Sequence, residues 1–481
     1  MSIDKPAKPT AATCQTSQAY ATSVIIHPRK VSGRFRSLKW WAMTLLLAYW
    51  HLAPFIRWDR GPGAPGQAIL ADMAGRRAYF FFIEIWPQEI YYLTGLLFIA
   101  AISLFLMTSL AGRVWCGFLC WQTVYTDLFV AVERLVIGDR NARIAFDRKP
   151  LGPEKIARKA AVNLLWLMIA AACGISFTLY FGDAFELSRD IFIGNASAAT
   201  YVAASVVGGM CFLLAGYARE QVCIYMCPYA RFQSAMFDEH SLIISYEAWR
   251  GEARAPAPVN GDFSNRGHCV DCGACVQACP TGIDIRNGNQ LACIGCGLCI
   301  DACATVMKRF GLPTDLVSYD SVANLEARGQ GRETKFRLVR PRTLIYGAIL
   351  LAVGSAMLFK LVTRPDTTVN VLHERAPLFV QMSDGSIRNG YVYKVLNMAR
   401  EPRTYRLGLS GIPGAFMDVV GGANHVAEAE LEVAGDSVGS FQVFVSAPPS
   451  QVPGKLAPLT FVLSGPSRVV ESETLFAGPD R

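Results

Sequence analysis

The sequence predicts a multi-domain membrane protein with a five-helix transmembrane domain, an inserted cysteine-rich domain and a C-terminal all-β, immunoglobulin-like sandwich. Charged residues make up only 17% of the 481 residues and hydrophobic residues 52%, whereas a soluble chain carries about a quarter charged residues. Eight of the 15 cysteines fall between residues 269 and 303. From about residue 365 onwards, short alternating runs of the kind that form strands replace the long apolar runs.

Five uncharged apolar runs are long enough, or nearly long enough, to cross a bilayer as helices. They cover residues 40–56, 90–112, 160–182, 193–217 and 343–359. Nine Lys and Arg residues lie in segment 113–159, whereas loop 183–192 holds three acids and only one Arg. The positive-inside rule therefore places the N-terminus and the cysteine-rich domain in the cytoplasm and the C-terminal domain on the outer side of the membrane. Membrane orientation also accounts for the net charge of +8 better than nucleic-acid binding does.

These observations divide the chain into six parts. They are a cytoplasmic tail (1–37), transmembrane helices 1–4 with their loops (38–250), the cysteine-rich domain (251–320), a linker (321–342), transmembrane helix 5 (343–362) and a periplasmic sandwich (363–481). The sandwich is expected to have about seven strands. It contains no grouping of His, Cys and acidic residues typical of catalysis, so its expected role is partner contact or scaffolding.

Two cysteine runs with the spacing of bacterial ferredoxins lie in the inserted domain. They read Cys269-x2-Cys272-x2-Cys275-x3-Cys279-Pro280 and Cys293-x2-Cys296-x2-Cys299-x3-Cys303. In such runs three closely spaced thiolates hold one [4Fe-4S] cluster, and the fourth cysteine ligates the other cluster. The predicted ligand sets are Cys269, Cys272, Cys275 and Cys303 for one cluster, and Cys293, Cys296, Cys299 and Cys279 for the second. A zinc site or a disulfide framework fits this spacing poorly.

Two further pairs read Cys116-Gly-Phe-Leu-Cys120 and Cys223-Ile-Tyr-Met-Cys227-Pro228. Each follows an even-numbered span, which indicates a weak internal repeat with four thiols at the cytoplasmic face. The i,i+4 spacing predicts that both sulfurs of a pair lie on one helix face. Soft thiolates favour Cu(I), zinc or iron–sulfur chemistry; since zinc is redox-silent, thiols beside two electron carriers indicate copper or an electron relay.

Plain packing is the alternative for these helix-end cysteines, because free Cys often behaves as a small hydrophobic residue. For Cys173 and Cys211, which stand singly within predicted spans, packing is the expected role. His51 lies within the first span, where a polar residue is a functional candidate. No second membrane histidine accompanies it, so its role stays open.

The arrangement resembles the CcoG/RdxA/FixG family of cytochrome c oxidase accessory proteins over nearly the whole chain. The matching stretches are His27-Pro-Arg-Lys-Val-Ser-Gly-Arg-Phe35, Gly112-Arg-Val-Trp-Cys-Gly117, Cys223-Ile-Tyr-Met-Cys-Pro-Tyr-Ala-Arg-Phe-Gln233 and the double run ending Cys299-Ile-Asp-Ala-Cys303. The resemblance implies an inner-membrane protein with two [4Fe-4S] clusters that assists assembly of a cbb-type haem–copper oxidase and reduces Cu(II) to Cu(I). It also implies oxidase subunits, or copper chaperones and transporters, as partners. Trp121 stands where the family has Pro, which questions a helix break after Cys120.

Three functions therefore stay open. In the preferred hypothesis the protein is an oxidoreductase, a cupric reductase. An unidentified cytoplasmic donor supplies electrons that pass through the clusters to copper at Cys116, Cys120, Cys223 and Cys227. The second is a quinol-oxidising electron-transfer subunit, similar to membrane ferredoxins of the NapH kind. The third is a non-enzymatic scaffold whose sandwich docks the oxidase. A homodimer is compatible with each.

Overall fold

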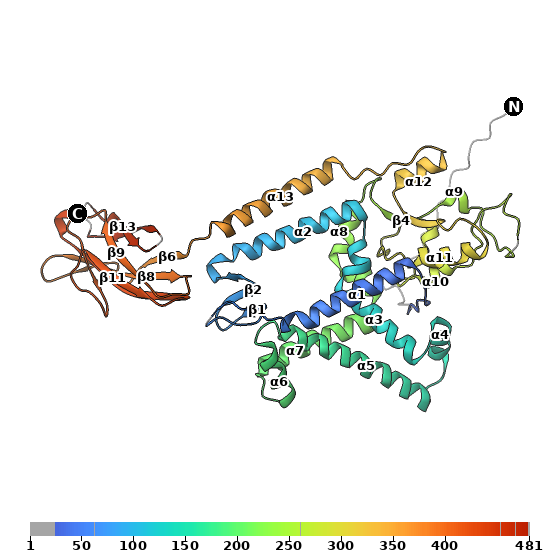
Figure 1. Ribbon diagram of the computed structural model, residues 1–481, viewed down its shortest axis with the longest axis horizontal. Coiled ribbons are helices and arrows are strands. Elements are labelled where there is room, and N and C mark those ends of the chain that lie inside the picture. The colour runs from blue at the N-terminus through green and yellow to red at the C-terminus, as the bar shows by residue number, and fades with distance from the viewer. Residues whose placement is uncertain (1–24, 62, 260, 453, 467, 480–481) are drawn as a thin grey trace. The chain divides into compact units, whose positions relative to one another are not determined.

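The computed structural model describes residues 25–61, 63–259, 261–452, 454–466 and 468–479 (Figure 1). The first 24 residues of the predicted tail therefore lie outside the described residues. The chain divides into two units, Met1–Met357 and Leu358–Arg481, and each is described by itself. The first contains the long helices and the cysteine-rich insert, and the second is built of strands.

Four helices in the described part of the chain are long and apolar enough to cross a membrane. They are α2 (Tyr91–Ala111, preceded by the 3-10 turn Pro87–Glu89), α5 (Pro153–Thr178), α7 (Ala198–Cys211, continued by the π-helix Phe212–Ala218) and α13 (Pro341–Val362). They correspond to the predicted spans 90–112, 160–182, 193–217 and 343–359. The protein is therefore a multi-pass membrane protein.

The remaining predicted span, 40–56, falls on α1 (Arg34–Leu52), which does not join these four. Three cations, Arg34, Arg36 and Lys39, occupy its first turns, and a short 3-10 turn (Ala53–Phe55) follows its end. The count of five spans is therefore not confirmed. The outward side chains of α1 are nevertheless apolar, since Trp41 is 68% exposed and Leu45 is 65% exposed.

Shorter elements connect the long helices. They are α3 (Trp121–Val136), α4 (Arg140–Arg148), α6 (Ala184–Ile193), α8 (Pro228–Met236) and an antiparallel sheet of β1 (Ile69–Asp72), β2 (Arg77–Phe80) and β3 (Ile83–Ile85). Helix α3 packs on α5, where the Phe129 and Trp166 rings stack 5.2 Å apart. The Trp166 indole N–H also donates to the Phe129 carbonyl at 3.0 Å, which fixes this contact in the buried core.

The cysteine-rich insert is closed by an antiparallel pair, β4 (Ile243–Tyr246) with β5 (Val317–Asp320). Between these strands lie α9 (Ala248–Gly251), α10 (Ala274–Ala278), the 3-10 turn Ile285–Asn287 and α11 (Leu298–Arg309). The cysteine-rich domain was predicted to begin at residue 251, but strand β4 lies before that residue. The predicted linker 321–342 contains helix α12 (Val322–Gly329).

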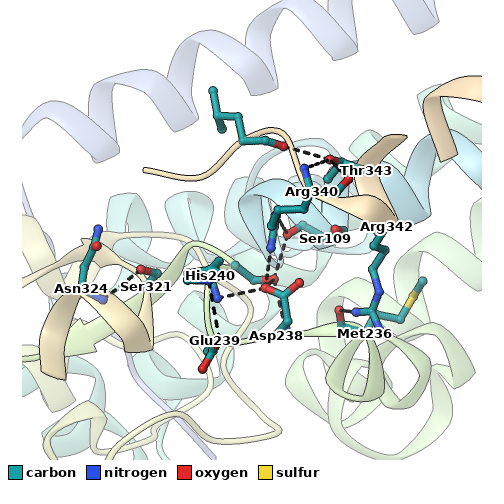
Figure 2. A network of polar contacts seen from close by, with 12 residues as sticks. Ser109, Met236, Asp238, Glu239, His240, Ser321, Asn324, Arg340, Arg342 and Thr343 are labelled. Carbon is teal, nitrogen blue, oxygen red and sulfur yellow. Dashed lines mark hydrogen bonds and ion pairs between the residues drawn. The ribbon is translucent and has the colours of Figure 1, made fainter. Parts of the chain in front are cut away.

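Arg340 anchors the start of α13 beside the end of α2 (Figure 2). Its guanidinium pairs with Asp238 and donates to the Ser109 carbonyl at 2.8 Å, and Arg342 donates to the Met236 carbonyl at 2.8 Å. Arg340 is only 7% exposed, so its partners satisfy a cation that would be costly to bury alone. One end of the α2–α13 helix pair is thereby joined to the segment that leads into the insert.

The second unit is a two-sheet β-fold whose described residues form nine strands, where about seven were expected from the sequence. The strands are β6 (Thr367–His373), β7 (Val380–Gln381), β8 (Ile387–Asn397), β9 (Arg403–Ser410), β10 (Phe416–Val419), β11 (Glu428–Val433), β12 (Ser437–Ala447), β13 (Leu456–Ser464) and β14 (Val469–Ala477). One sheet has the order β10-β12-β8-β6, with β7 on β8, and the other has the order β11-β9-β13-β14. Strand β11 alternates exposed glutamates with buried Ala429, Leu431 and Val433, as a strand with one face on a core requires.

Candidate functional site

The eight cysteines of the insert line two small neighbouring cavities. Cys269, Cys272, Cys275 and Cys303 line the first, together with residues of β4, α11 and β5 that include Tyr246, Met307 and Val317. Cys279, Cys293, Cys296 and Cys299 line the second, with Cys275 on the shared wall. Each run thus sends its fourth cysteine to the cavity of the other run, as in a two-cluster ferredoxin. These donor sets fit two [4Fe-4S] clusters, which would supply one-electron transfer when bound.

Glycines at two equivalent positions let the chain turn around these cavities. Gly273 precedes α10 with φ +63° and Gly297 precedes α11 with φ +71°. This left-handed region strains residues that carry a Cβ. Each turn leads directly into a short helix that carries the next cysteines, so the spacing of the motif and the backbone conformation agree.

The two helix-end cysteine pairs share a local fold that differs from the expected α-helical face. Cys116 lies in a π-helical turn, Trp115–Leu119, and Cys223 in another, Val222–Met226. Cys120 and Cys227 then leave the helix with extended backbone, and α3 and α8 begin at the next residue. The prediction of both sulfurs on one helix face is therefore wrong, because the chain breaks at the second cysteine. The break occurs at Trp121 as well as at Pro228.

The internal repeat extends to the residue four positions before each pair. Gly112 has φ +61° and ψ −131°, and Arg219 has φ +41° and ψ −117°. Such a conformation in a non-glycine residue stores strain that the surrounding structure must hold. The Arg219 side chain is correspondingly fixed, since it donates to the Gly216 carbonyl at 2.7 Å and pairs with Glu133.

The four helix-end thiols lie near one another. The charges of Cys120, Cys223 and Cys227 all act on Cys116, and those of Cys120 and Cys227 act on Cys223. Burial is the main cause that raises the pKa of Cys116 and of Cys223 to about 12. Both are therefore protonated near neutral pH, and a soft cation bound as thiolate would displace protons. Among the described residues, no three His, Cys, Asp or Glu side chains gather closely enough to hold a single ion.

The helix-end pairs touch the second cysteine set of the insert. Cys116 and Cys223 pack against Ile294, Cys296 and Leu298. Here the two backbones meet: a Cβ on Gly117 would lie 2.7 Å from the Gly295 carbonyl oxygen and 2.9 Å from the Cys296 Cα. Only glycine allows this approach, because real Cβ atoms do not come so near to backbone.

Arg113 joins the helix end to the same loop of the insert. Its buried guanidinium donates to the carbonyls of Leu291 and Cys293, the latter at 3.0 Å, and to the Ala230 carbonyl at 2.6 Å. Its positive charge acts on Cys116, Cys223, Cys227 and Cys293. No role was predicted for Arg113 or Gly117, although both lie in the stretch Gly112–Gly117. A glycine between two cysteines was the one sequence feature that could have indicated a close backbone contact.

The first turn of α1 (Arg34–Leu52) also lies against the insert, a contact that was not predicted from the sequence. The Asp301 carboxylate, between Cys299 and Cys303, accepts the backbone N–H groups of Phe35 at 3.3 Å and Arg36 at 2.7 Å. It thereby caps the first turn of α1, whose unsatisfied N–H groups favour an anion. The start of α1 is thus held by a residue that lies in the sequence between two of the predicted cluster ligands.

The remaining predicted candidates lie elsewhere. His51 Nδ1 is 2.6 Å from the Ser176 hydroxyl. Cys173 and Cys211 belong to the buried core of α3, α5 and α7 with Tyr125 and Phe129, where packing was expected.

Family comparisons cover most of the chain. Residues 218–322 match a family described as a 4Fe-4S dicluster domain, and residues 93–136 match one described as a 4Fe-4S binding domain. Residues 357–479 match a family described as the IG-like fold at the C-terminus of FixG. A crystal structure of a FixG-related protein from Vibrio parahaemolyticus aligns with 24% of this chain and 96% of its own, at 20% identity and a TM-score of 0.21.

Three relatives are similar to this chain over most of their length. Protein RdxB of Cereibacter sphaeroides is 47% identical over 82% of this chain and 84% of its own. Nitrogen fixation protein FixG of Rhizobium meliloti is 42% identical over 88% of this chain and 86% of its own. Protein RdxA of Cereibacter sphaeroides is 42% identical over 90% of this chain and 92% of its own. With two cysteine sets that fit iron–sulfur clusters and a C-terminal domain of the FixG type, the chain belongs to the FixG/RdxA family of iron–sulfur membrane proteins.

Proposed function

We propose that this protein reduces Cu(II) to Cu(I) at its helix-end thiols, for delivery to a cbb-type cytochrome c oxidase during assembly. The observation that carries the proposal is the contact of Cys116 and Cys223 with the loop around Cys296. Membership of the FixG/RdxA family supports iron–sulfur electron transfer as the underlying activity.

Copper enters this proposal as the substrate. Cu(II) takes up one electron and becomes Cu(I), and thiolate ligands favour the reduced ion. Because no single-ion site is preformed among the described residues, the thiols of Cys116, Cys120, Cys223 and Cys227 would bind copper in passing. A site that holds the product loosely suits a protein that must hand it on.

The chain's own residues prepare the thiols for this task. The buried cation of Arg113 lies among them and favours the thiolate form, opposing the burial that keeps Cys116 and Cys223 protonated. Gly117 holds the backbone of the first pair against Gly295 and Cys296, so the distance that an electron crosses stays short.

The chain order supports the proposed sidedness. The helix-end thiols and the insert lie together, and the positively charged segment 113–159 runs from just after α2 into the first two turns of α5. We therefore propose that thiols and insert face the cytoplasm and that the β-domain is periplasmic, where it would contact oxidase subunits or copper carriers.

The test uses anaerobically purified full-length protein, reduced with dithionite and freed of excess reductant. Cu(II) is added, and Cu(I) is measured with a Cu(I)-specific chelator. We expect the double variant Cys223→Ser/Cys227→Ser to form Cu(I) about ten-fold more slowly than wild type, with an unchanged cluster EPR signal. Cys173→Ala is the matched control, since it removes a thiol buried in the helix core. Equal rates in wild type and the double variant would refute the proposal.

A further inference from the structure

A cavity of about 320 Å³ lies between α1, α3, α5 and α7, next to the first helix-end cysteine pair. These four helices run side by side in the lower half of Figure 1. The lining side chains are Trp50, Trp121, Gln122, Tyr125, Phe177, Val207, Met210, Cys211, Leu214 and Ala215. The volume lies within the range of small-molecule sites.

Three aromatic rings form one wall of this cavity. Trp50 meets Trp121 edge to face with ring centroids 4.4 Å apart, and Trp121 lies 4.8 Å from Tyr125. Such a wall offers flat faces to a planar ring. The other side is aliphatic, from α7 and its π-helical continuation, and Met210 there is 56% exposed towards the surroundings of the helix bundle. A hydrophobic ligand could therefore enter from the lipid.

Two donors of the aromatic wall lack a normal hydrogen-bond acceptor. Among the described residues, the buried Trp50 indole N–H has no hydrogen-bond partner, and the buried Tyr125 hydroxyl has no oxygen or nitrogen partner. Tyr125 as a residue is only 1% exposed, and its polar neighbour is the sulfur of Cys173, a weak acceptor. Buried polar groups are normally satisfied, and an exception calls for an explanation such as an absent ligand.

We propose that this cavity binds the head group of a membrane quinol, which donates the electrons used by the protein. A quinone ring is planar, it enters from the bilayer, and its two oxygens can accept from Trp50 and Tyr125. Trp121 follows Cys120 directly in the chain, so the ring would lie next to the first helix-end pair, whose other member, Cys116, contacts the second cysteine set. This proposal rests on the proposed function in one respect: it names the quinol as the source of the electrons that reduce copper.

The numbers of electrons exchanged explain why two one-electron carriers would be useful. Oxidation of one quinol to quinone releases two electrons and two protons, whereas each Cu(II) takes one electron. Two bound clusters would accept one electron each and would pass them on singly. The two protons would move into the neighbouring cavity, which shares Gln122 with the quinol cavity and is lined by Asp127 and Glu220.

Binding is tested first, on full-length protein in lipid nanodiscs titrated with decylubiquinone, followed by quenching of tryptophan fluorescence. Tyr125→Phe removes one donor and keeps the ring, so we expect affinity to fall about ten-fold. Ala215→Phe fills the cavity and should abolish binding. Tyr217→Phe is the matched control, because the Tyr217 hydroxyl is already paired with Asn163 at 2.5 Å.

Decylbenzene, which has ring and tail but no oxygens, separates a quinone site from a merely apolar one. Equal binding of decylbenzene, or unchanged decylubiquinone affinity in Tyr125→Phe and Ala215→Phe, would overturn the proposal. In the second step, anaerobic decylubiquinol should bleach the cluster absorbance of wild type and not of Ala215→Phe. Binding without bleaching would overturn the donor role. Copper reduction after dithionite treatment bypasses this cavity, so its outcome judges the proposed function separately.

Discussion

The two cysteine sets of the insert have the same spacing and different surroundings. Cys272 of the first set is exposed, and the cation beside that set, Arg286, is compensated by Asp271 at 2.5 Å and Asp284 at 2.7 Å. In the second set Cys296 and Cys299 are buried, and the helix-end thiols and Arg113 lie against their loop.

This difference teaches that equal ligand spacing does not imply equal roles. The first set meets solvent, and the second meets the membrane helices. An electron that moves between the membrane part and the insert would therefore cross at the second set, with the first set as a store or as the contact for a soluble partner.

The largest effect is expected when one predicted ligand is removed from each cysteine set, in two separate variants. Cys296→Ala should lose the second cluster and with it nearly all dithionite-supported copper reduction. Cys272→Ala should lose the first cluster and keep part of that activity, because Cys116 and Cys223 contact the second set. Iron content, EPR and Cu(I) formation measure the outcome. Equal loss of activity in both variants would contradict the division of roles.

A smaller effect is expected from the backbone contact at Gly117. Gly117→Ala would place a Cβ 2.7 Å from the Gly295 carbonyl oxygen, and relieving that overlap should cost about 1–3 kcal/mol. Copper reduction should slow while both clusters remain. Gly209→Ala is the control, since nothing lies within 4 Å of its added Cβ. Reduction rates and thermal unfolding check this; a Gly117→Ala protein that matches Gly209→Ala would show that the contact is not tight.

The smallest effect concerns reduction potentials. Arg113→Gln removes a cation beside Cys293 whose hydrogen bonds go to backbone carbonyls, so the potential of the second cluster should become more negative. Arg286→Gln should shift the first cluster less, because two carboxylates already balance that charge. EPR-monitored redox titration of both variants makes the comparison. A larger shift in Arg286→Gln would mean that charge compensation does not distinguish the sets.

Much of the fold was predictable because its signals are local. Long apolar runs predicted α2, α5, α7 and α13, and alternation predicted the β-domain. The span at 40–56 was less secure, since Arg34, Arg36 and Lys39 belong to the same helix. The π-turns that break at Cys120 and Cys227 were not predicted, because i,i+4 spacing is equally compatible with a continuous helix and sequence alone does not choose between them.

The sequence by itself determined the ligand inventory: which cysteines form two ferredoxin runs and which form the helix-end pairs. Spacing along the chain is sufficient for this, because each run folds around its own turn. Only the tertiary structure decided what these groups face. The contact of Gly117 with Gly295, the Asp301 cap on α1 and the aromatic cavity beside Trp121 join residues far apart in sequence. Such contacts depend on how helices pack, and no spacing within a single motif specifies that.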